Sequence, residues 1–370
     1  MYGDVGKGVL EELTKPVSKY YVRCNSLKIS PKDLQEKLRS HGFKIELNPA
    51  IQEAIPEALA LHLEGPFEVP MRGQEIIVDK KTAESAMQGA NVYAPGIMNC
   101  GSMHVGDEIT IVSELGDVIA SGRAVMSTND ILTFRKGLAV QIEHRRFEGP
   151  SVRELPEFSQ GLLYPQSLAA MVTSRVLGPK PNETIVDMNC APGGKLSHMS
   201  QLTENSGRLL GFDRNSQKLT QTRNSMSRLG CTNAVLSIHD SRYLDADFPD
   251  LKADRVLIDP PCSALGLRPK VYDFTSINRV NNMANYQKQF VKTASRLAKP
   301  GGVIVYSVCT ITKEECEQIA EFAERECDLK IMDQRPFIGS KSLFFQSGLF
   351  CQRFNPHVDE IGYFIAKFKR

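Results

Sequence analysis

Hydrophobic and polar positions between residues 162 and 370 alternate between two patterns. Apolar runs of strand length lie at residues 184–188, 208–213, 234–238, 254–258 and 302–307, and segments with helical spacing, such as 216–229, lie between several of them. Strands that alternate with helices predict an α/β fold with a doubly wound parallel sheet and right-handed crossovers. A closing strand is predicted over residues 361–366, and a helix over residues 162–177 is predicted to precede the sheet, with Pro165 in its first turn.

The first 70 residues predict a separate small α/β unit. Residues 9–13 have the pattern of a short helix, and residues 20–25 that of a strand. Ser30 and Pro31 then mark the start of a second helix, because serine is a common N-cap and proline is tolerated in a first turn.

Residues 71–148 have a third pattern, with strands predicted at 75–78, 108–112, 118–122 and 139–142 and a short helix at 82–87. Short strands between turn signals predict a small β-barrel. Residues 89–97, followed by Gly106 and Asp107, closely resemble the PUA domain, an RNA-binding barrel. The basic side chains that we consider for phosphate contacts are Arg123, Arg135, Lys136, Arg145 and Arg146, and Tyr93 is a further RNA-binding candidate. Residues 149–370 would then form the third domain.

Composition agrees with a multidomain globular protein. The chain has 370 residues, of which 41% are hydrophobic and 24% charged, as is usual for soluble proteins. No apolar run approaches the roughly 18 residues of a membrane span, and the N-terminus does not resemble a signal peptide, so we expect a cytoplasmic protein without membrane contact. The net charge is only +2, so any basic surface for a nucleic acid must be local.

The cysteines are predicted to be separate reduced thiols and not to form a disulfide framework. There are nine of them, an odd number with no Cys-x-x-Cys pair, and the seven histidines are scattered. This pattern argues against a zinc site and against disulfides.

Candidate ligand-binding residues follow the first three strands of the predicted sheet. The first strand runs into Cys190-Ala191-Pro192-Gly193-Gly194-Lys195 and then a helix, where glycines allow close backbone approach and a helix start offers free amide donors. This is not the Gly-x-Gly-x-x-Gly fingerprint, so a dinucleotide oxidoreductase is disfavoured. Asp213 ends the second strand, where a carboxylate can bind a ribose diol. Asp240 follows the third strand, in a position to meet an adenine amino group.

Two thiols follow two further strands. Asp259-Pro260-Pro261-Cys262 leaves the strand at 254–258, and proline cannot continue a central ladder, so these residues enter a loop at the ligand-binding edge of the sheet. Cys309 ends the strand at 302–307. The usual strand order makes these strands neighbours, about 4.8 Å apart, so both sulfurs can face one cavity. Sequence spacing does not rank the two thiols.

At this point the chain resembles a known family. Asp187 to Lys195, Asp213, Lys218, Asp240, Asp259 to Cys262 and Ser307 to Thr310 are similar, in this order, to the motifs of the NSUN family of RNA cytosine-C5 methyltransferases. Residues 21–28 also resemble the N-terminal RNA-binding unit of that family, and an inserted PUA domain is the arrangement of its sixth subfamily. The departure is Asn189-Cys190, where the family usually has Cys-Ala.

This resemblance implies a class I, Rossmann-like methyltransferase that uses S-adenosylmethionine. It implies as substrate a cytidine at position 72 of the tRNA acceptor stem, with the PUA domain holding the CCA end, and we expect a monomer. The implied cofactor-binding residues are Asn189, Cys190, Ala191, Pro192, Gly193, Gly194, Lys195, Asp213, Lys218, Asp240 and Asp259. The RNA-binding candidates outside the barrel are Arg23, Asn25, Arg268 and Lys270.

The chemistry of cytosine requires the same groups. C5 is a poor nucleophile, and a thiolate that adds to C6 makes it enamine-like. A carboxyl group can manage the proton at N3, for which Asp259 is the candidate, and Lys195 is a candidate for lowering a thiol pKa from about 8.5. The family resemblance assigns the attack to Cys309 and product release to Cys262.

Two alternatives remain. The first is a class I methyltransferase that acts on an exocyclic amine, since Asp-Pro-Pro followed by an aromatic residue serves such enzymes; here Cys262 stands in place of the aromatic residue. The second is a catalytically silent RNA-binding protein.

A target base in a paired stem must also be extruded to reach a thiol. Arg268 and Lys270 are predicted to hold the displaced backbone.

Overall fold

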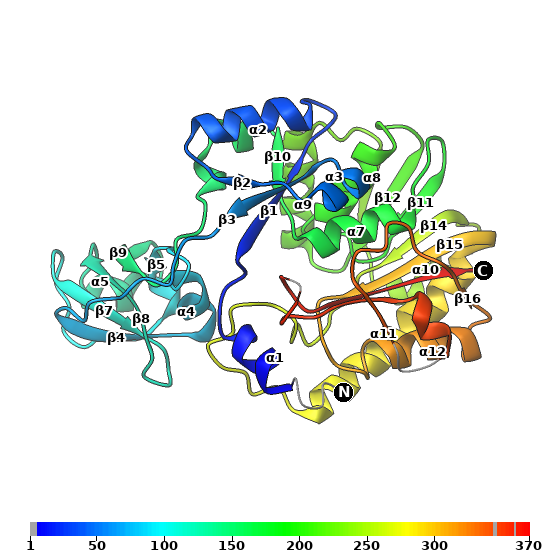
Figure 1. Cartoon of the computed structure of the whole chain (residues 1–370). Coiled ribbons are helices and arrows are strands. Elements are labelled where there is room, and N and C mark those ends of the chain that lie inside the picture. The colour runs from blue at the N-terminus through cyan, green and yellow to red at the C-terminus, as the bar shows by residue number, and fades with distance from the viewer. Residues whose placement is uncertain (1–5, 343–345, 359) are drawn as a thin grey trace.

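The computed structural model describes residues 6–342, 346–358 and 360–370, and its strands form three sheets (Figure 1). In the largest sheet, five parallel strands are followed by antiparallel ones, and β16 (Lys330–Ile331) pairs with β19. The spatial order of the others is β13 (Ala234–Ile238), β12 (Arg208–Asp213), β11 (Thr184–Asp187), β14 (Ala253–Ile258), β15 (Ala298–Val308), β19 (Tyr363–Lys369), β18 (Gln352–Phe354) and β17 (Ser340–Lys341). The predicted doubly wound parallel sheet is confirmed, and its strand order reverses at β11 and β14, where ligands bind in such folds.

Alternate residues of the central strands pack on opposite faces of this sheet. Ile185 and Leu257 belong to a core with one set of helices, whereas their neighbours Val186 and Val256 belong to a core with the other set. Burial on both faces explains why these strands are continuously apolar. The first set is α7 (Leu168–Leu177), α8 (Gly194–Leu202) and α9 (Ser216–Leu229); the second is α10 (Leu244–Asp247), α11 (Ile277–Leu297) and α12 (Glu317–Glu326).

The N-terminal unit has a four-stranded sheet that takes one strand from beyond the barrel. Its order is β10 (Leu163–Pro165), β1 (Lys19–Cys24), β3 (Ala58–His62) and β2 (Ile45–Glu46), with helices α2 (Pro31–Ser40) and α3 (Pro49–Ala54). The predicted helix over 162–177 therefore begins too early. Pro165 pairs with Val22 at the sheet edge, and α7 begins only at Leu168, after the N-cap Ser167.

The barrel forms the third sheet, at the left of Figure 1. Its strands in spatial order are β5 (Val92–Tyr93), β9 (Leu138–Arg145), β8 (Val118–Ala124), β7 (Glu108–Val112), β4 (Gln74–Val78) and β6 (Ile97–Asn99), with helices α4 (Lys80–Ala86) and α5 (Thr128–Phe134). Helix α1 (Gly6–Leu13) lies apart from the rest of the N-terminal unit, below the sheet that the unit forms. No helix among the described residues is long and apolar enough to span a bilayer.

Candidate active site

Cys262 and Cys309 come together at the carboxyl ends of two neighbouring strands. Strands β14 and β15 pair in parallel, with Ile258 opposite Tyr306, so the loop after one strand meets the end of the other. The two sulfur atoms lie 3.4 Å apart, and both residues line the same cavity. The prediction that both thiols face one cavity is confirmed.

The surroundings of the two thiols are not equivalent. A hydrogen bond from the Cys262 thiol lowers the pKa of Cys309 below its ordinary value, although burial opposes this effect. The Lys195 ammonium adds a smaller effect that also lowers the pKa of Cys309. The same hydrogen bond and burial raise the pKa of Cys262 well above its ordinary value. The proton between the sulfurs therefore stays on Cys262, and Cys309 is the thiol that ionises first, a ranking that spacing along the chain does not supply.

Asp259 is held by two side chains, Lys195 from the first turn of α8 and Ser307 from β15. Lys195 Nζ donates to Asp259 Oδ2 at 2.6 Å, and Ser307 Oγ donates to Asp259 Oδ1 at 3.1 Å. Burial alone would lower the pKa of Lys195, but the Asp259 carboxylate raises it above its ordinary value. Lys195 therefore stays a cation that orients Asp259.

A buried glutamate, which no sequence motif marked, fixes the Cys262 loop. Glu315 is fully buried, and its Oε1 accepts hydrogen bonds from the Ser263 backbone N at 2.8 Å and from Gln287 Nε2 at 2.9 Å. Gln287 Nε2 also donates to Pro261 O at 3.0 Å. Because partners this far apart in sequence meet only in the folded chain, their spacing carries no signal.

A cavity of about 380 Å³ adjoins the two thiols at the ends of β11 to β14. The predicted residues that line it are Asn189, Ala191, Asp213, Lys218, Asp240, Asp259, Cys262 and Cys309. Residues that the sequence analysis missed also line it, among them Arg214, Asn215, His239 and Tyr286. Arg214 lies over the Tyr286 ring, 5.9 Å from its centroid, and only the tertiary structure brings these two together.

The two cavity-facing aspartates differ in how far their charge is already paired. Asp240 accepts from Arg242 Nη2 at 2.6 Å and from Arg242 Nε at 2.9 Å, and this arginine lowers the pKa of Asp240. Within the described ranges, the one side-chain hydrogen bond of Asp213 is that which its Oδ1 accepts from the Asn215 backbone N, at 2.8 Å. Of the two carboxylates, that of Asp213 has the greater capacity left for a ligand.

Some of the predicted cofactor residues do not line this cavity. The Cys190 side chain lies in the core, 3% exposed, and Pro192, Gly193 and Gly194 are also outside the lining. A Cβ at Gly193 would lie 3.0 Å from Thr222 Cγ2, and one at Gly194 would lie 3.1 Å from the Tyr164 ring. Glycine is therefore required at these two positions because α8 packs closely against α9 and Tyr164, and not because a ligand approaches the backbone there.

Arg23 and Asn25 are not RNA-binding residues, and these predictions were wrong. Arg23 is 1% exposed and donates to Gly194 O at 2.6 Å and to Ser197 Oγ at 2.7 Å. Asn25 is 2% exposed and donates to Gly161 O and Leu229 O, each at 2.8 Å. Because a buried polar group needs internal partners, both side chains tie the N-terminal unit to the catalytic sheet.

Arg268, which was also predicted to contact RNA, is held by internal partners. Its side chain is 6% exposed and pairs with Glu12 at 2.8 Å. It also donates to Lys15 O and Pro356 O, each at 3.0 Å, and so holds α1 against the catalytic domain. Lys270 pairs with Asp273 at 3.2 Å.

The barrel candidates differ in accessibility. Tyr93 is 56% exposed and Arg146 is exposed. Arg123 pairs with Glu143 at 3.3 Å, and Arg145 pairs with Glu148. Tyr93 and Arg146 are therefore the candidates best placed to meet a ligand.

Comparison with known families divides the chain in the same way as its fold. The family model for the 16S rRNA methyltransferase RsmB/F matches residues 174–369, and the PUA domain model matches residues 74–146. The first includes the parallel sheet and both thiols, and the second includes the barrel.

Individual relatives match over nearly the whole chain. A tRNA (cytosine(72)-C(5))-methyltransferase of Pyrococcus horikoshii is 38% identical over 98% of this chain and 92% of its own. The human tRNA (cytosine(72)-C(5))-methyltransferase NSUN6 is 28% identical over 97% of this chain and 90% of its own. The crystal structure of NSun6 from Pyrococcus horikoshii with SFG, an analogue of S-adenosylmethionine, superposes with a TM-score of 0.89 at 38% identity, over 98% of this chain and 93% of that one.

Proposed function

Because the chain belongs to the NSUN family of RNA cytosine-C5 methyltransferases, we propose that it methylates C5 of a cytidine in tRNA, at position 72 of the acceptor stem. Position 72 and tRNA are what the names of the relatives at 38% and 28% identity state. The observation that carries the catalytic part is the pair of sulfurs 3.4 Å apart beside the cavity. Methylation of an exocyclic amine does not require two neighbouring thiols, and a catalytically silent RNA-binding protein does not require them either.

The lining of the cavity fits S-adenosylmethionine. Asn189 Oδ1 is buried there without a hydrogen-bond partner among the described residues, and the Asp213 carboxylate faces the same space. Both accept hydrogen bonds, whereas the cofactor offers donors in its ribose hydroxyls and amino groups. A volume of about 380 Å³ lies within the usual range of small-molecule sites. When bound, this cofactor supplies an electrophilic methyl group.

The protein groups prepare the cytosine for that methyl group. The Cys309 thiolate adds to C6, so that an S–C6 bond forms and the C5–C6 double-bond electrons move towards N3. Lys195 holds the Asp259 carboxyl group where it can hydrogen-bond to the edge of the base as charge develops. C5 then becomes nucleophilic and forms the new C–C bond.

Release reverses the first step. The proton at C5 leaves, the double bond forms again, and the S–C6 bond breaks to give back the Cys309 thiolate. The Cys262 sulfur lies 3.4 Å from that of Cys309 and is placed to assist this elimination.

The experiment traps the covalent step. The full chain is incubated with S-adenosylmethionine and tRNA that contains 5-fluorocytidine, from which a C5 proton cannot be removed. We expect a denaturation-resistant protein–RNA adduct that is lost in Cys309→Ser and kept in the control Cys327→Ser, which changes a thiol remote from the cavity. With ordinary cytidine, Cys262→Ala should accumulate the adduct. Absence of an adduct with the unmodified chain would refute covalent catalysis.

A second measurement tests the position. Bisulfite sequencing of the methylated tRNA should show 5-methylcytidine at position 72, and tRNA with uridine at that position should stay unmethylated. Methylation at another cytidine would contradict the proposed site and leave the chemistry intact.

A further inference from the structure

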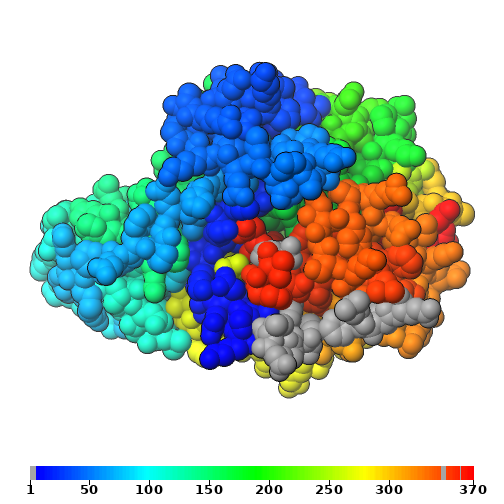
Figure 2. Space-filling model, in the orientation of Figure 1, coloured from blue at the N-terminus to red at the C-terminus, as the bar shows by residue number. Residues whose placement is uncertain are grey.

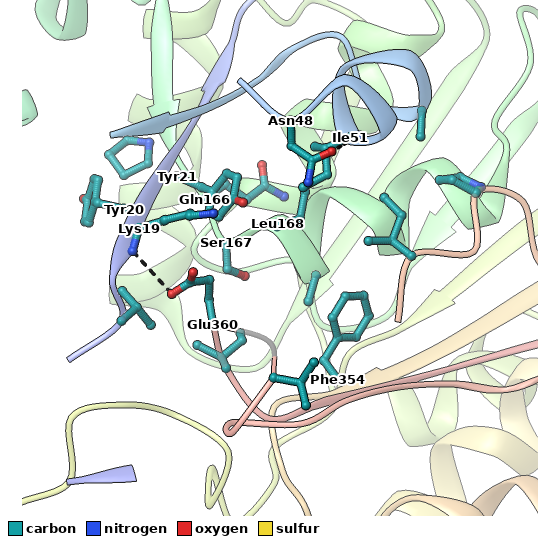
Figure 3. A pocket seen from close by; sticks show the side chains of 18 of the residues that line it. Lys19, Tyr20, Tyr21, Asn48, Ile51, Gln166, Ser167, Leu168, Phe354 and Glu360 are labelled. Carbon is teal, nitrogen blue, oxygen red and sulfur yellow. Dashed lines mark hydrogen bonds between the residues drawn. The ribbon is translucent and has the colours of Figure 1, made fainter. Parts of the chain in front are cut away.

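A second and larger cavity, of about 1000 Å³, lies where the three units of the chain meet (Figure 3). Its lining comes from β1 and α3 of the N-terminal unit, from residues 165–169 and 336–338, and from Phe354, Val358, Glu360 and Ile361 near the C-terminus. The barrel contributes Gln88. Figure 2 shows this face hollowed where the N-terminal segments meet the C-terminal ones. Neither thiol of the active site lines this cavity.

Gln166 offers an unused hydrogen-bond donor to this cavity. It is 7% exposed and lies among the lining side chains. Its Oε1 accepts from Arg23 Nη1, and because a guanidinium only donates, this contact fixes which end of the amide is the oxygen. The Nε2 group is then directed away from Arg23, buried, with no partner among the described residues. A ligand atom that accepts a hydrogen bond would satisfy it.

The charges around the cavity leave one cation uncommitted. Lys19 pairs with Glu46 at 2.6 Å, and Glu360 accepts hydrogen bonds from the backbone N of Ser18, at 2.9 Å, and of Lys19, at 3.3 Å (Figure 3). Arg153 lines the cavity, is exposed, and makes no ion pair among the described residues, although it hydrogen-bonds to the Tyr20 side chain. No carboxylate neutralises its charge there, so it can bind an anion.

The walls favour a flat ring. Tyr20, Phe337 and Phe354 line the cavity together with Ile51 and Leu168. Aromatic side chains beside a cation are the usual platform for an unpaired base and its phosphate. Two acids oppose this reading of the charges, since Glu53, which is exposed, and Glu360 also line the cavity and would repel a phosphate.

We propose that this cavity binds one unpaired nucleotide of the RNA substrate, close in sequence to the target cytidine. This proposal rests on the proposed function. Gln166 donates to a carbonyl or ring nitrogen of the base, the aromatic side chains hold its ring, and Arg153 binds its phosphate. Ala264 lines the cofactor cavity and Arg268 lines the second one, and four residues span at most about 14 Å. A strand whose cytidine lies at Cys309 therefore reaches the second cavity within a few nucleotides.

Binding of the full chain to an acceptor-stem RNA hairpin with a CCA end tests this proposal, measured by fluorescence anisotropy without methyl donor. Gln166→Glu keeps an oxygen for Arg23 and replaces the free donor by an acceptor. We expect it, and Arg153→Ala, each to raise Kd about tenfold, and Glu53→Gln to lower it. Arg39→Ala removes an exposed arginine of α2 in the same unit and should leave Kd unchanged. Equal Kd values for Gln166→Glu and the unmodified chain would overturn the proposal.

Abasic RNAs identify the nucleotide. Removing the base at one unpaired position should weaken binding to the unmodified chain and abolish the penalty of Gln166→Glu. A penalty that persists with every abasic RNA, or a cavity that GMP or UMP fills without competing with RNA, would refute a substrate nucleotide. The two proposals fail separately: Gln166-dependent binding of an RNA that stays unmethylated in a separate assay with S-adenosylmethionine would contradict the proposed function alone.

Discussion

Replacement of Cys262 by alanine should make Cys309 a weaker acid. The Cys262 thiol lies 3.4 Å from the Cys309 sulfur and is the main cause that lowers the pKa of Cys309. A hydrogen bond to a charged group contributes roughly 1.5–3 kcal/mol, and one pKa unit corresponds to about 1.4 kcal/mol. Loss of the donor should therefore raise the pKa of Cys309, and a free energy of this size corresponds to about 10- to 100-fold slower labelling of Cys309 at a pH where the thiol is mostly protonated.

Alkylation measures this change in pKa without RNA, so a role of Cys262 in product release does not affect the result. The rate at which iodoacetamide labels Cys309, followed by peptide mass spectrometry between pH 5 and 10, should rise at a higher pH in Cys262→Ala. Cys262→Ser keeps a donor and should stay near the unmodified chain. Burial raises the pKa of Cys24 to about 12, so this thiol should label slowly throughout. An identical pH profile for Cys262→Ala and the unmodified chain would refute the hydrogen bond as the cause.

Four further predictions concern stability, the docking of α1 and the cofactor. Glu57 is buried and binds both Arg175 Nε, at 2.9 Å, and His198 Nε2, at 2.7 Å. Glu57→Gln should therefore lower the free energy of unfolding, measured by urea titration, by about 3 kcal/mol. A loss below about 1 kcal/mol would contradict this prediction. Burial lowers the pKa of His198 to about 4, so below about pH 6.5 the unfolded chain binds a proton that the folded chain does not. The free energy of unfolding should therefore fall from pH 6.5 to 4, and a value that is constant over this range would exclude the effect. Arg268→Ala should accelerate hydrogen exchange in α1, and a loss of RNA affinity with unchanged exchange would instead support its predicted RNA contact. Asp213→Ala should weaken S-adenosylmethionine binding about tenfold in calorimetry without changing Cys309 alkylation, since one hydrogen-bonding carboxylate contributes on this order.

The pattern of apolar residues was sufficient for most of the catalytic domain. The helix predicted over 216–229 is α9, with the same bounds, and the predicted parallel strands are present. Periodicity reports which faces are buried, and a strand buried on both faces has few other interpretations. The prediction failed at residues 162–166, where helical spacing was present but β1 offered an unpaired edge.

Burial of charged and polar side chains was not predictable in this way. Arg23, Asn25 and Arg268 have residue types that are usually exposed, and each seemed available to RNA until its partners were known. Those partners are carbonyl, hydroxyl and carboxylate groups more than 80 positions away, such as Leu229 O for Asn25 and Glu12 for Arg268. Glu315 was not predicted for the same reason, since its hydrogen-bond donors Ser263 and Gln287 come close to it only in the folded chain.

The sequence by itself determined the order of the motifs, the parallel sheet that collects them at one edge, and the presence of two thiols at neighbouring strand ends. These features depend on local periodicity and on chain connectivity. Only the tertiary structure decided which thiol is the stronger acid, because the hydrogen bond between the two sulfurs lowers the pKa of Cys309 and raises that of Cys262. It also decided where the three units enclose the second cavity, since a surface between units is a property of their packing.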